Sequence, residues 1–176
     1  MTIVVNFLAG SGTGKTTVAS DVFSRLKKAG IESELASEFA KDLVWERSFD
    51  LLKNQIFIFG NQFLRIDRLI NKVDVVITDS PLLLSIMFKQ PWLSNTFNDL
   101  VLEVHNQYNN LNYFIERTIP YNPIGRVEKT INEAINKDNE IRQILVNNEI
   151  PYKSIINNEE DIQNVVNDIV NKLESK

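Results

Sequence analysis

The chain of 176 residues has a formal net charge of −4, with 43% hydrophobic and 24% charged residues. This length and hydrophobic content predict that residues 1–176 form one compact domain. We expect the domain to be cytoplasmic, because no apolar run approaches the roughly 20 residues that span a bilayer. The absence of cysteine and the presence of only 1 histidine exclude disulfides and a zinc site of thiolates or imidazoles. A bound metal must have oxygen ligands, and the acidic charge argues against tight non-specific binding to nucleic acid.

Strands and helices are predicted to alternate along the chain. The run 2–10, TIVVNFLAG, is apolar and rich in β-branched residues, as in a buried parallel strand, and 14–30 has apolar residues at helical spacing. The remaining predictions are a strand over 31–37, a helix over 49–71, a strand over 73–81, helices over 82–88 and 96–110, a strand over 112–117, a helix over about 127–148, a strand over 152–157 and a helix through 162–173. This alternation predicts a parallel sheet with helices on both faces.

The junction of the first strand and helix carries a phosphate-binding motif. Ala9–Thr16, AGSGTGKT, matches the phosphate loop except that alanine replaces its first glycine. Gly10, Gly12 and Gly14 let consecutive backbone N–H groups surround an anion at a helix N-terminus. Lys15 is predicted to reach the β and γ phosphates, and the Thr16 hydroxyl to hold magnesium. The alternative is a glycine-rich turn before an ordinary helix.

A second magnesium-directed group is expected at the end of a neighbouring strand, where VVITDSP supplies Asp79. The alternative role of Asp79 is to cap the helix that follows Pro81. The nearby sequence NKVD, Asn71–Asp74, spells the guanine-reading motif of switch GTPases, but it precedes its strand, whereas ligands of open α/β sheets bind at the carboxyl ends. The GTPase interpretation is therefore not adopted.

Candidates for contact with a phosphoryl acceptor follow the second strand. Glu38 is placed to orient or deprotonate an acceptor hydroxyl, and the alternative is a surface glutamate at a helix start. Gln55 and Gln62 share one helix face and are able to read a base edge, but we expect a solvated face. The aromatic residues Phe49, Phe57, Phe59 and Phe63 are expected in the core.

Two arginines are expected on a lid over the transferred phosphoryl group. Arg117 ends a strand on the ligand side, and Arg126 closes a loop that contains Pro120 and Pro123. Guanidinium groups delivered by a mobile segment screen charge and exclude water during phosphoryl transfer. The alternative is a surface loop with solvated arginines.

In this order, AGSGTGKTT, SEFAKD, VVITDSPLL and ERTIPYNPIGR resemble the small P-loop kinase family that includes the nicotinamide riboside kinase domain of bacterial NAD-salvage proteins and many bacteriophage-encoded relatives. The resemblance implies a three-layer P-loop NTPase fold of nucleoside monophosphate kinase type, with a five-stranded parallel sheet in the order 2-3-1-4-5. It also implies ATP and Mg²⁺ at the phosphate loop and an arginine-bearing lid at about 117–130. The expected nucleotide-binding residues are Gly10, Ser11, Gly12, Thr13, Gly14, Lys15, Thr16, Thr17 and Arg117.

The leading hypothesis is an ATP-dependent kinase that moves the γ-phosphoryl group to a nucleoside-like or nucleotide-like small molecule. In this hypothesis Lys15 and Arg126 stabilise the transferring group, Thr16 and Asp79 hold the metal, and Glu38 serves the acceptor. A kinase acting on DNA or RNA and a nucleotide-gated ATPase acting through a partner are the alternatives. No membrane partner is expected, and a homodimer is compatible with the sequence.

Overall fold

The computed structural model describes residues 1–122 and 128–175. The strands are β1 (Ile3–Leu8), β2 (Ser33–Ala36), β3 (Val75–Thr78), β4 (Asn109–Ile115) and β5 (Lys153–Ile155). The helices are α1 (Lys15–Lys28), α2 (Phe39–Trp45), α3 (Phe49–Leu52), α4 (Gln55–Asp67), α5 (Leu84–Phe88), α6 (Asn95–Asn106), α7 (Ile131–Asn147) and α8 (Glu159–Glu174). In the described part of the chain, no helix is long and apolar enough to cross a membrane.

The strands form one five-stranded parallel sheet in the order β2-β3-β1-β4-β5, as predicted. Its central strand β1 pairs with β3 on one side and β4 on the other, so that Ile3 lies opposite both Val75 and Asn109. All six residues of β1 are buried, because helices cover both faces of the sheet. This accounts for the continuous apolar run that predicted the strand.

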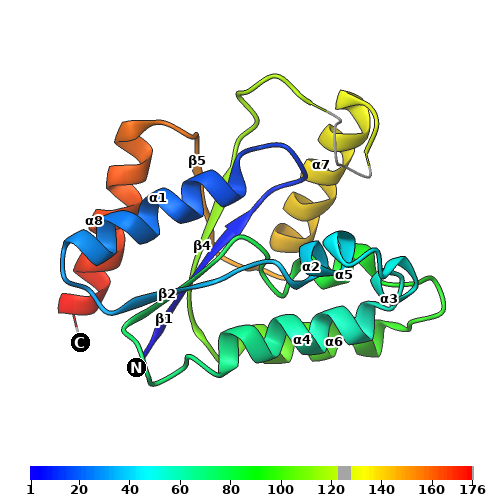
Figure 1. Ribbon diagram of the computed structural model, residues 1–176, viewed down its shortest axis with the longest axis horizontal. Helices are drawn as coiled ribbons and strands as arrows, with labels where there is room; N and C mark the ends of the chain where they lie inside the picture. The colour runs from blue at the N-terminus through cyan, green and yellow to red at the C-terminus, as the bar shows by residue number, and fades with distance from the viewer. Residues whose placement is uncertain (123–127, 176) are drawn as a thin grey trace.

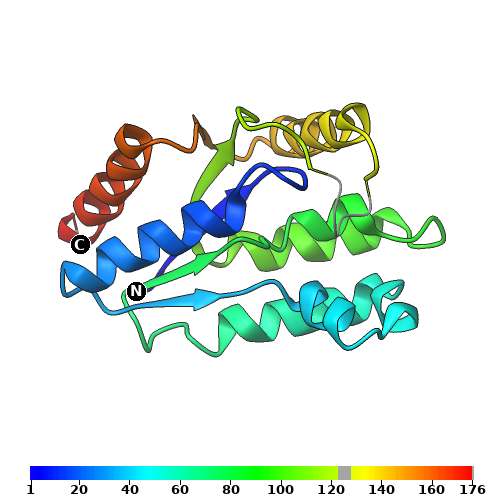
Figure 2. The ribbon, with the colours of Figure 1, turned by 45° about the horizontal axis from the view of Figure 1, so that its top comes forward.

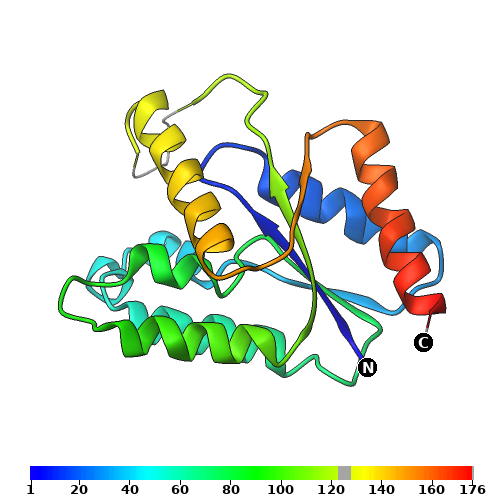
Figure 3. The ribbon, with the colours of Figure 1, turned by 180° about the vertical axis from the view of Figure 1, so that it is seen from behind.

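Two layers of helices enclose the sheet (Figures 1 and 2). Ile3, Val5 and Phe7 of β1 pack in a cluster with α1 and α8, whereas Val4 and Leu8 pack in a second cluster with α4, α6 and α7. Alternate side chains of a strand point to opposite faces, so these clusters are the two hydrophobic cores of a three-layer structure. Figure 3 shows the layer of α4, α6 and α7 from behind.

Two predicted helices have different bounds in the structure. The helix expected over 49–71 is two helices, α3 and α4, because Asn54 interrupts it and its side chain accepts a hydrogen bond from the Phe57 backbone N–H at 3.2 Å. An asparagine in this position is an N-cap, which starts a new helix. The helix expected over 96–110 ends at Asn106, because Asn109 and Asn110 pair with β1.

A third helix prediction is wrong at its start. The helix expected from about residue 127 begins at Ile131, where the Thr130 side chain accepts a hydrogen bond from the Glu133 backbone N–H at 3.2 Å. The Glu133 carboxylate in turn accepts a hydrogen bond from the Lys129 backbone N–H at 2.7 Å. The two bonds satisfy backbone N–H groups at and just before the start of the helix, where no intrahelical partner exists, and they define its first turn.

Candidate functional site

The phosphate loop joins the end of β1 to the start of α1 (Figure 1). Gly12 and Gly14 have φ of 77° and 92°, which lie in the left-handed region that side-chain-bearing residues rarely adopt. Gly14 is the N-cap of α1 and offers no side chain to the free N–H groups of the first turn. The loop therefore presents backbone donors and the positive end of a helix to the same point, as an anion site requires.

Lys15 begins α1 and turns back over the loop. Its Nζ donates a hydrogen bond to the Gly10 carbonyl oxygen at 2.8 Å, and the buried Thr13 hydroxyl donates to the same oxygen at 3.2 Å. Burial lowers the pKa of Lys15, and the charge of Arg117 adds to this, whereas nearby carboxylates oppose it. A bound triphosphate would supply further negative charge and favour the protonated ammonium group. Thr17 is also among the expected nucleotide-binding residues. It follows Thr16 in α1, and it is exposed.

Thr16 and Asp79 meet beside the loop. The Thr16 hydroxyl donates to Asp79 Oδ2 at 2.6 Å, which joins the first turn of α1 to the end of β3. The other oxygen, Asp79 Oδ1, is buried and has no hydrogen-bond partner among the described residues. Asp79 does not cap a helix, because the next one, α5, begins at Leu84 with Leu83 as its N-cap. Its carboxylate is thus available to a ligand at the loop.

Glu38 lies between β2 and α2 and is the N-cap residue of α2, although its side chain makes no capping hydrogen bond. Burial raises the pKa of Glu38, and the negative charge of Asp79 raises it further, while the positive charges of Lys15 and Lys41 oppose the rise. These interactions place the carboxylate near both Lys15 and Asp79. A carboxylate with a raised pKa next to a phosphate loop has the chemistry of a proton acceptor.

The glutamines of α4 are buried, contrary to the expected solvated face. Gln62 is 3% exposed, accepts a hydrogen bond from the Phe39 backbone N–H at 2.9 Å, and donates to the Thr78 hydroxyl at 3.4 Å. Gln55 is 4% exposed and donates to the Ser85 hydroxyl at 3.1 Å. Both amides therefore join α4 to neighbouring elements beside the site.

The aromatic residues expected in the core divide into two pairs. Phe59 is buried and Phe63 packs partly buried against the same cluster. Phe49 and Phe57 are instead 54% and 37% exposed. The expectation is wrong for this second pair. The break at Asn54 separates Phe49 on α3 from the apolar stripe of α4. Phe57 lies on α4 but packs against Phe39 of α2, with ring centroids 5.5 Å apart, and stays outside the core.

Arg117 follows β4 and is held by Asp138 of α7. Its Nε donates to Asp138 Oδ2 at 2.9 Å, and the Gly10 backbone N–H donates to Asp138 Oδ1 at 2.6 Å. One carboxylate thus joins the end of β4 to the phosphate loop. Arg126, the other predicted lid arginine, lies outside the described residues.

A second carboxylate touches the loop from the segment before α7. The Ser11 hydroxyl donates to Glu128 Oε2 at 2.7 Å, and the Tyr121 hydroxyl donates to the Glu128 carbonyl oxygen at 2.8 Å. The Tyr121 ring also lies 5.5 Å from the centre of the Arg117 guanidinium. The described ends of the predicted lid therefore pack on the loop at Ser11 and Gly10.

Asp138 and Glu128 are site residues that were not predicted from the sequence. For Asp138 a signal was present, because Ala134, Asp138, Ile141 and Leu145 recur at helical spacing and all four are buried on α7. A carboxylate on the apolar stripe of a helix requires a partner, since an unpaired buried charge is strongly destabilising. For Glu128 no comparable pattern exists, because it precedes α7 and belongs to no helix or strand.

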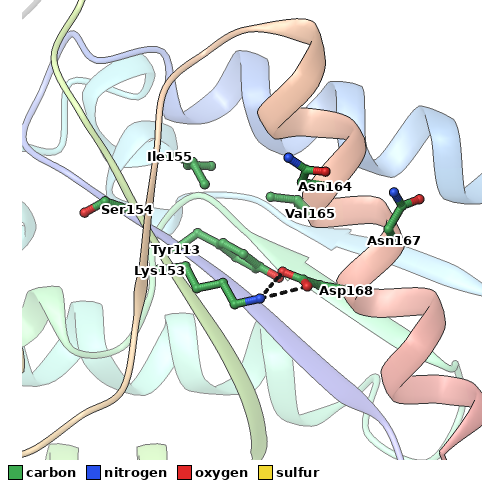
Figure 4. Close-up of a pocket in the computed structure, with 8 residues that line it drawn as sticks. All are labelled: Tyr113, Lys153, Ser154, Ile155, Asn164, Val165, Asn167 and Asp168. Carbon is green, nitrogen blue, oxygen red and sulfur yellow. Dashed lines mark hydrogen bonds and ion pairs between the residues drawn. The ribbon is translucent and has the colours of Figure 1, made fainter.

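A separate pocket of about 340 Å³ lies between β5 and α8 (Figure 4). Its charged groups pair with one another: Lys153 Nζ donates to Asp168 Oδ1 and Oδ2 at 2.8 and 2.7 Å, and the Tyr113 hydroxyl donates to Asp168 Oδ2 at 3.0 Å. None of the residues that line this pocket belongs to the phosphate loop. We interpret it as a structural contact of α8 with the sheet.

Comparison with known proteins places the fold among solved structures. No protein-family model matches the sequence, and no curated protein sequence matches it. The structure of NadR protein in complex with NR superposes with a TM-score of 0.69 and 16% identity, covering 98% of this chain and 50% of NadR. The chain thus spans about half the length of NadR. Thymidylate kinase from Ehrlichia chaffeensis superposes with a TM-score of 0.60 and 15% identity, covering 98% of each chain.

At these identities the likeness concerns the fold. Together with the observed strand order, it shows a P-loop fold of nucleoside monophosphate kinase type, as the sequence resemblance implied. The Asn71–Asp74 sequence precedes β3, so it lies at the edge of the sheet opposite the phosphate loop, as expected. The chemistry of the site must be argued from its own residues.

Proposed function

We propose that this protein is a phosphotransferase that uses ATP and Mg²⁺ and moves the γ-phosphoryl group to a nucleoside-like or nucleotide-like small molecule. The observation that carries the proposal is the pairing of Thr16 with Asp79 beside Lys15, with Asp79 Oδ1 buried and unpartnered among the described residues. The fold type, and its similarity to the structures of a thymidylate kinase and of NadR protein in complex with NR, support the same conclusion.

The donor atoms fit magnesium. The Thr16 hydroxyl and the Asp79 carboxylate are oxygen ligands, which Mg²⁺ prefers. Within residues 1–122 and 128–175, no three acidic, histidine or cysteine side chains gather into a metal site. Mg²⁺ in such enzymes is commonly held by one or two protein groups together with substrate phosphates and waters. When bound, it neutralises charge on the β and γ phosphates.

Each residue of the site has a proposed role in phosphoryl transfer. The loop N–H groups and Lys15 bind the triphosphate, and Glu38 takes the proton of the acceptor hydroxyl. A bond forms between that hydroxyl oxygen and the γ-phosphorus while the bond to the bridging oxygen of the β-phosphate breaks. The products are ADP, the phosphorylated acceptor and a proton that Glu38 passes to solvent.

The charges near Glu38 are of both signs. Lys15 and Lys41 lower the pKa of the Glu38 carboxyl, whereas Asp79 and Asp42 raise it, and the effect of Lys15 is the largest of the four. The neighbouring Arg65 is engaged, because it donates to the Ser37 hydroxyl at 3.0 Å and pairs with Asp42. The proposed acceptor therefore includes both nucleoside-like and nucleotide-like molecules, and the acceptor panel distinguishes them.

The proposal is tested by incubating the protein with ATP and Mg²⁺ against a panel of nucleosides, nicotinamide riboside, nucleoside monophosphates and DNA, with the product read by mass spectrometry. We expect one small acceptor to gain a phosphoryl group. Lys15→Met should abolish the transfer without unfolding the chain, whereas Lys53→Met, the same change at a side chain that is 77% exposed, should not. Hydrolysis without a phosphorylated acceptor would contradict the proposal and favour a nucleotide-gated ATPase.

A further inference from the structure

Asp138 connects the phosphate loop to Arg117 from a fixed position on α7. Its neighbours on the helix face, Ala134 and Ile141, are buried in the protein at 0% and 1% exposure, so the backbone that carries Asp138 has little freedom. Each of its oxygens accepts one hydrogen bond, from the Gly10 N–H and from Arg117 Nε. The Asp138 and Arg117 side chains are both 10% exposed.

Arg117 has donors left over after this pairing. Its Nη1 and Nη2 are buried and have no hydrogen-bond partner among the described residues. Nη2 lies 3.4 Å from the position that a Cβ on Gly10 would occupy, which places this end of the guanidinium at the start of the phosphate loop. Leaving buried charged donors unpaired is costly, and the planar guanidinium suits bidentate binding of phosphate.

We propose that Asp138 is a positioning residue that holds Arg117 against the phosphate loop, so that Nη1 and Nη2 meet the bound triphosphate. The inference rests on the proposed function only in that the loop binds a nucleoside triphosphate. Asp138 itself makes no hydrogen bond to phosphate, because a carboxylate only accepts hydrogen bonds, and it accepts them from Gly10 and Arg117. It acts through the direction that it imposes on Arg117.

Neutralising Asp138 tests the proposal, because the direction of the change in nucleotide affinity differs between a charge effect and a positioning effect. A carboxylate close to a triphosphate repels it, so neutralising Asp138 would tighten nucleotide binding if charge alone mattered. If orientation of Arg117 dominates, the same change weakens binding. The two effects act in opposite directions, and the measured affinity decides between them.

The experiment is a calorimetric titration with magnesium and the non-hydrolysable ATP analogue AMPPNP, which needs no acceptor. We compare the wild type with Asp138→Asn, Arg117→Gln and the double variant, and use Asp168→Asn as a matched control that breaks an ion pair far from the loop. We expect each single change to weaken binding about tenfold, as for a charged hydrogen bond. The double variant should be no weaker than Arg117→Gln, because Asp138 works through that residue.

If the two residues acted independently, the double variant would lose about 100-fold in AMPPNP affinity, and this result would overturn the inference. Tighter AMPPNP binding by Asp138→Asn would also overturn it. Unchanged binding with a lowered unfolding temperature would show a structural role only, and would also overturn it. If Asp138→Asn fails to fold, Gly10→Ala attacks the same bridge, because the new Cβ would lie 2.7 Å from Asp138 Oδ1. Weaker AMPPNP binding by that variant is then expected, and unaltered binding would refute the inference.

The same titration separates this inference from the proposed function. If the wild type binds AMPPNP but phosphorylates no acceptor, the kinase proposal fails. The variants then still decide whether Asp138 positions Arg117. A wild-type protein that binds no nucleotide would overturn both.

Discussion

Replacing Glu38 by glutamine tests the assignment of the proton acceptor. The substitution keeps the size of the side chain and removes both its negative charge and its ability to take a proton. General-base catalysis commonly contributes about 10²- to 10⁴-fold to a rate, so kcat should fall by that amount. The affinity for nucleotide should not fall, because Glu38 is assigned to the acceptor, and removing its negative charge near Lys15 also removes a repulsion of the triphosphate.

The fold should tolerate this change. The Glu38 side chain does not cap α2, so no helix-capping energy is lost, and we expect the free energy of unfolding to change by less than about 0.5 kcal/mol at acidic pH. Because burial raises the pKa of Glu38 above its usual value of 4.5, the folded wild type binds this proton more tightly than the unfolded chain does. The stability that this provides is complete below pH 4.5 and is lost as the pH rises through the raised pKa. Glu38→Gln should therefore be relatively more stable than the wild type near neutral pH.

The assay is the pH dependence of kcat/KM with the acceptor found in the panel. In the wild type, activity should rise with pH through the raised pKa of Glu38, because only the carboxylate accepts a proton. Glu38→Gln should lose both the activity and this limb of the profile. Glu46→Gln, an exposed change at the other end of α2, is the control. Full activity in Glu38→Gln, or an unchanged acid limb, would refute the assignment.

Two further predictions concern the metal ligands and the pocket near α8. Asp79→Asn and Thr16→Val should each raise the magnesium concentration needed for half-maximal activity. Thr16→Ser keeps the hydroxyl and should leave this concentration unchanged. Equal effects of the valine and serine variants would contradict metal binding by Thr16. Tyr113→Phe should lower the free energy of unfolding by about 1 kcal/mol through loss of the hydrogen bond to Asp168 and leave kcat unchanged, as checked by denaturant unfolding and the kinase assay. A large loss of activity would show that the pocket between β5 and α8 takes part in function.

The local structure of the phosphate loop could be predicted from the sequence. The glycines of AGSGTGKT have few other uses at this spacing, and two of them do adopt positive φ. The apolar run before the loop and the helical spacing after it were also sufficient to predict β1 and α1. Such features depend on residues that are neighbours along the chain, which is why the motif is readable without a structure.

Element boundaries were less predictable, because they depend on competition between local preferences and distant partners. Asn109 and Asn110 continue a helical pattern in the sequence, but pairing with β1 makes them part of a strand. Gln62 looks like a surface residue until Phe39 and Thr78 are brought against it from two other elements. Tertiary contacts of this kind override local preferences.

The sequence by itself determined the alternation of strands and helices, the phosphate loop, and the carboxylate of Asp79 at the end of a neighbouring strand, because these are set by spacing along the chain. Only the tertiary structure decided that Asp138 reaches Gly10 and Arg117, which are 128 and 21 residues away from it in sequence. A hydrogen bond acts over about 3 Å and has no dependence on sequence separation. The parallel sheet brings the ends of β1 and β4 to one edge, and packing of α7 there places a carboxylate between them.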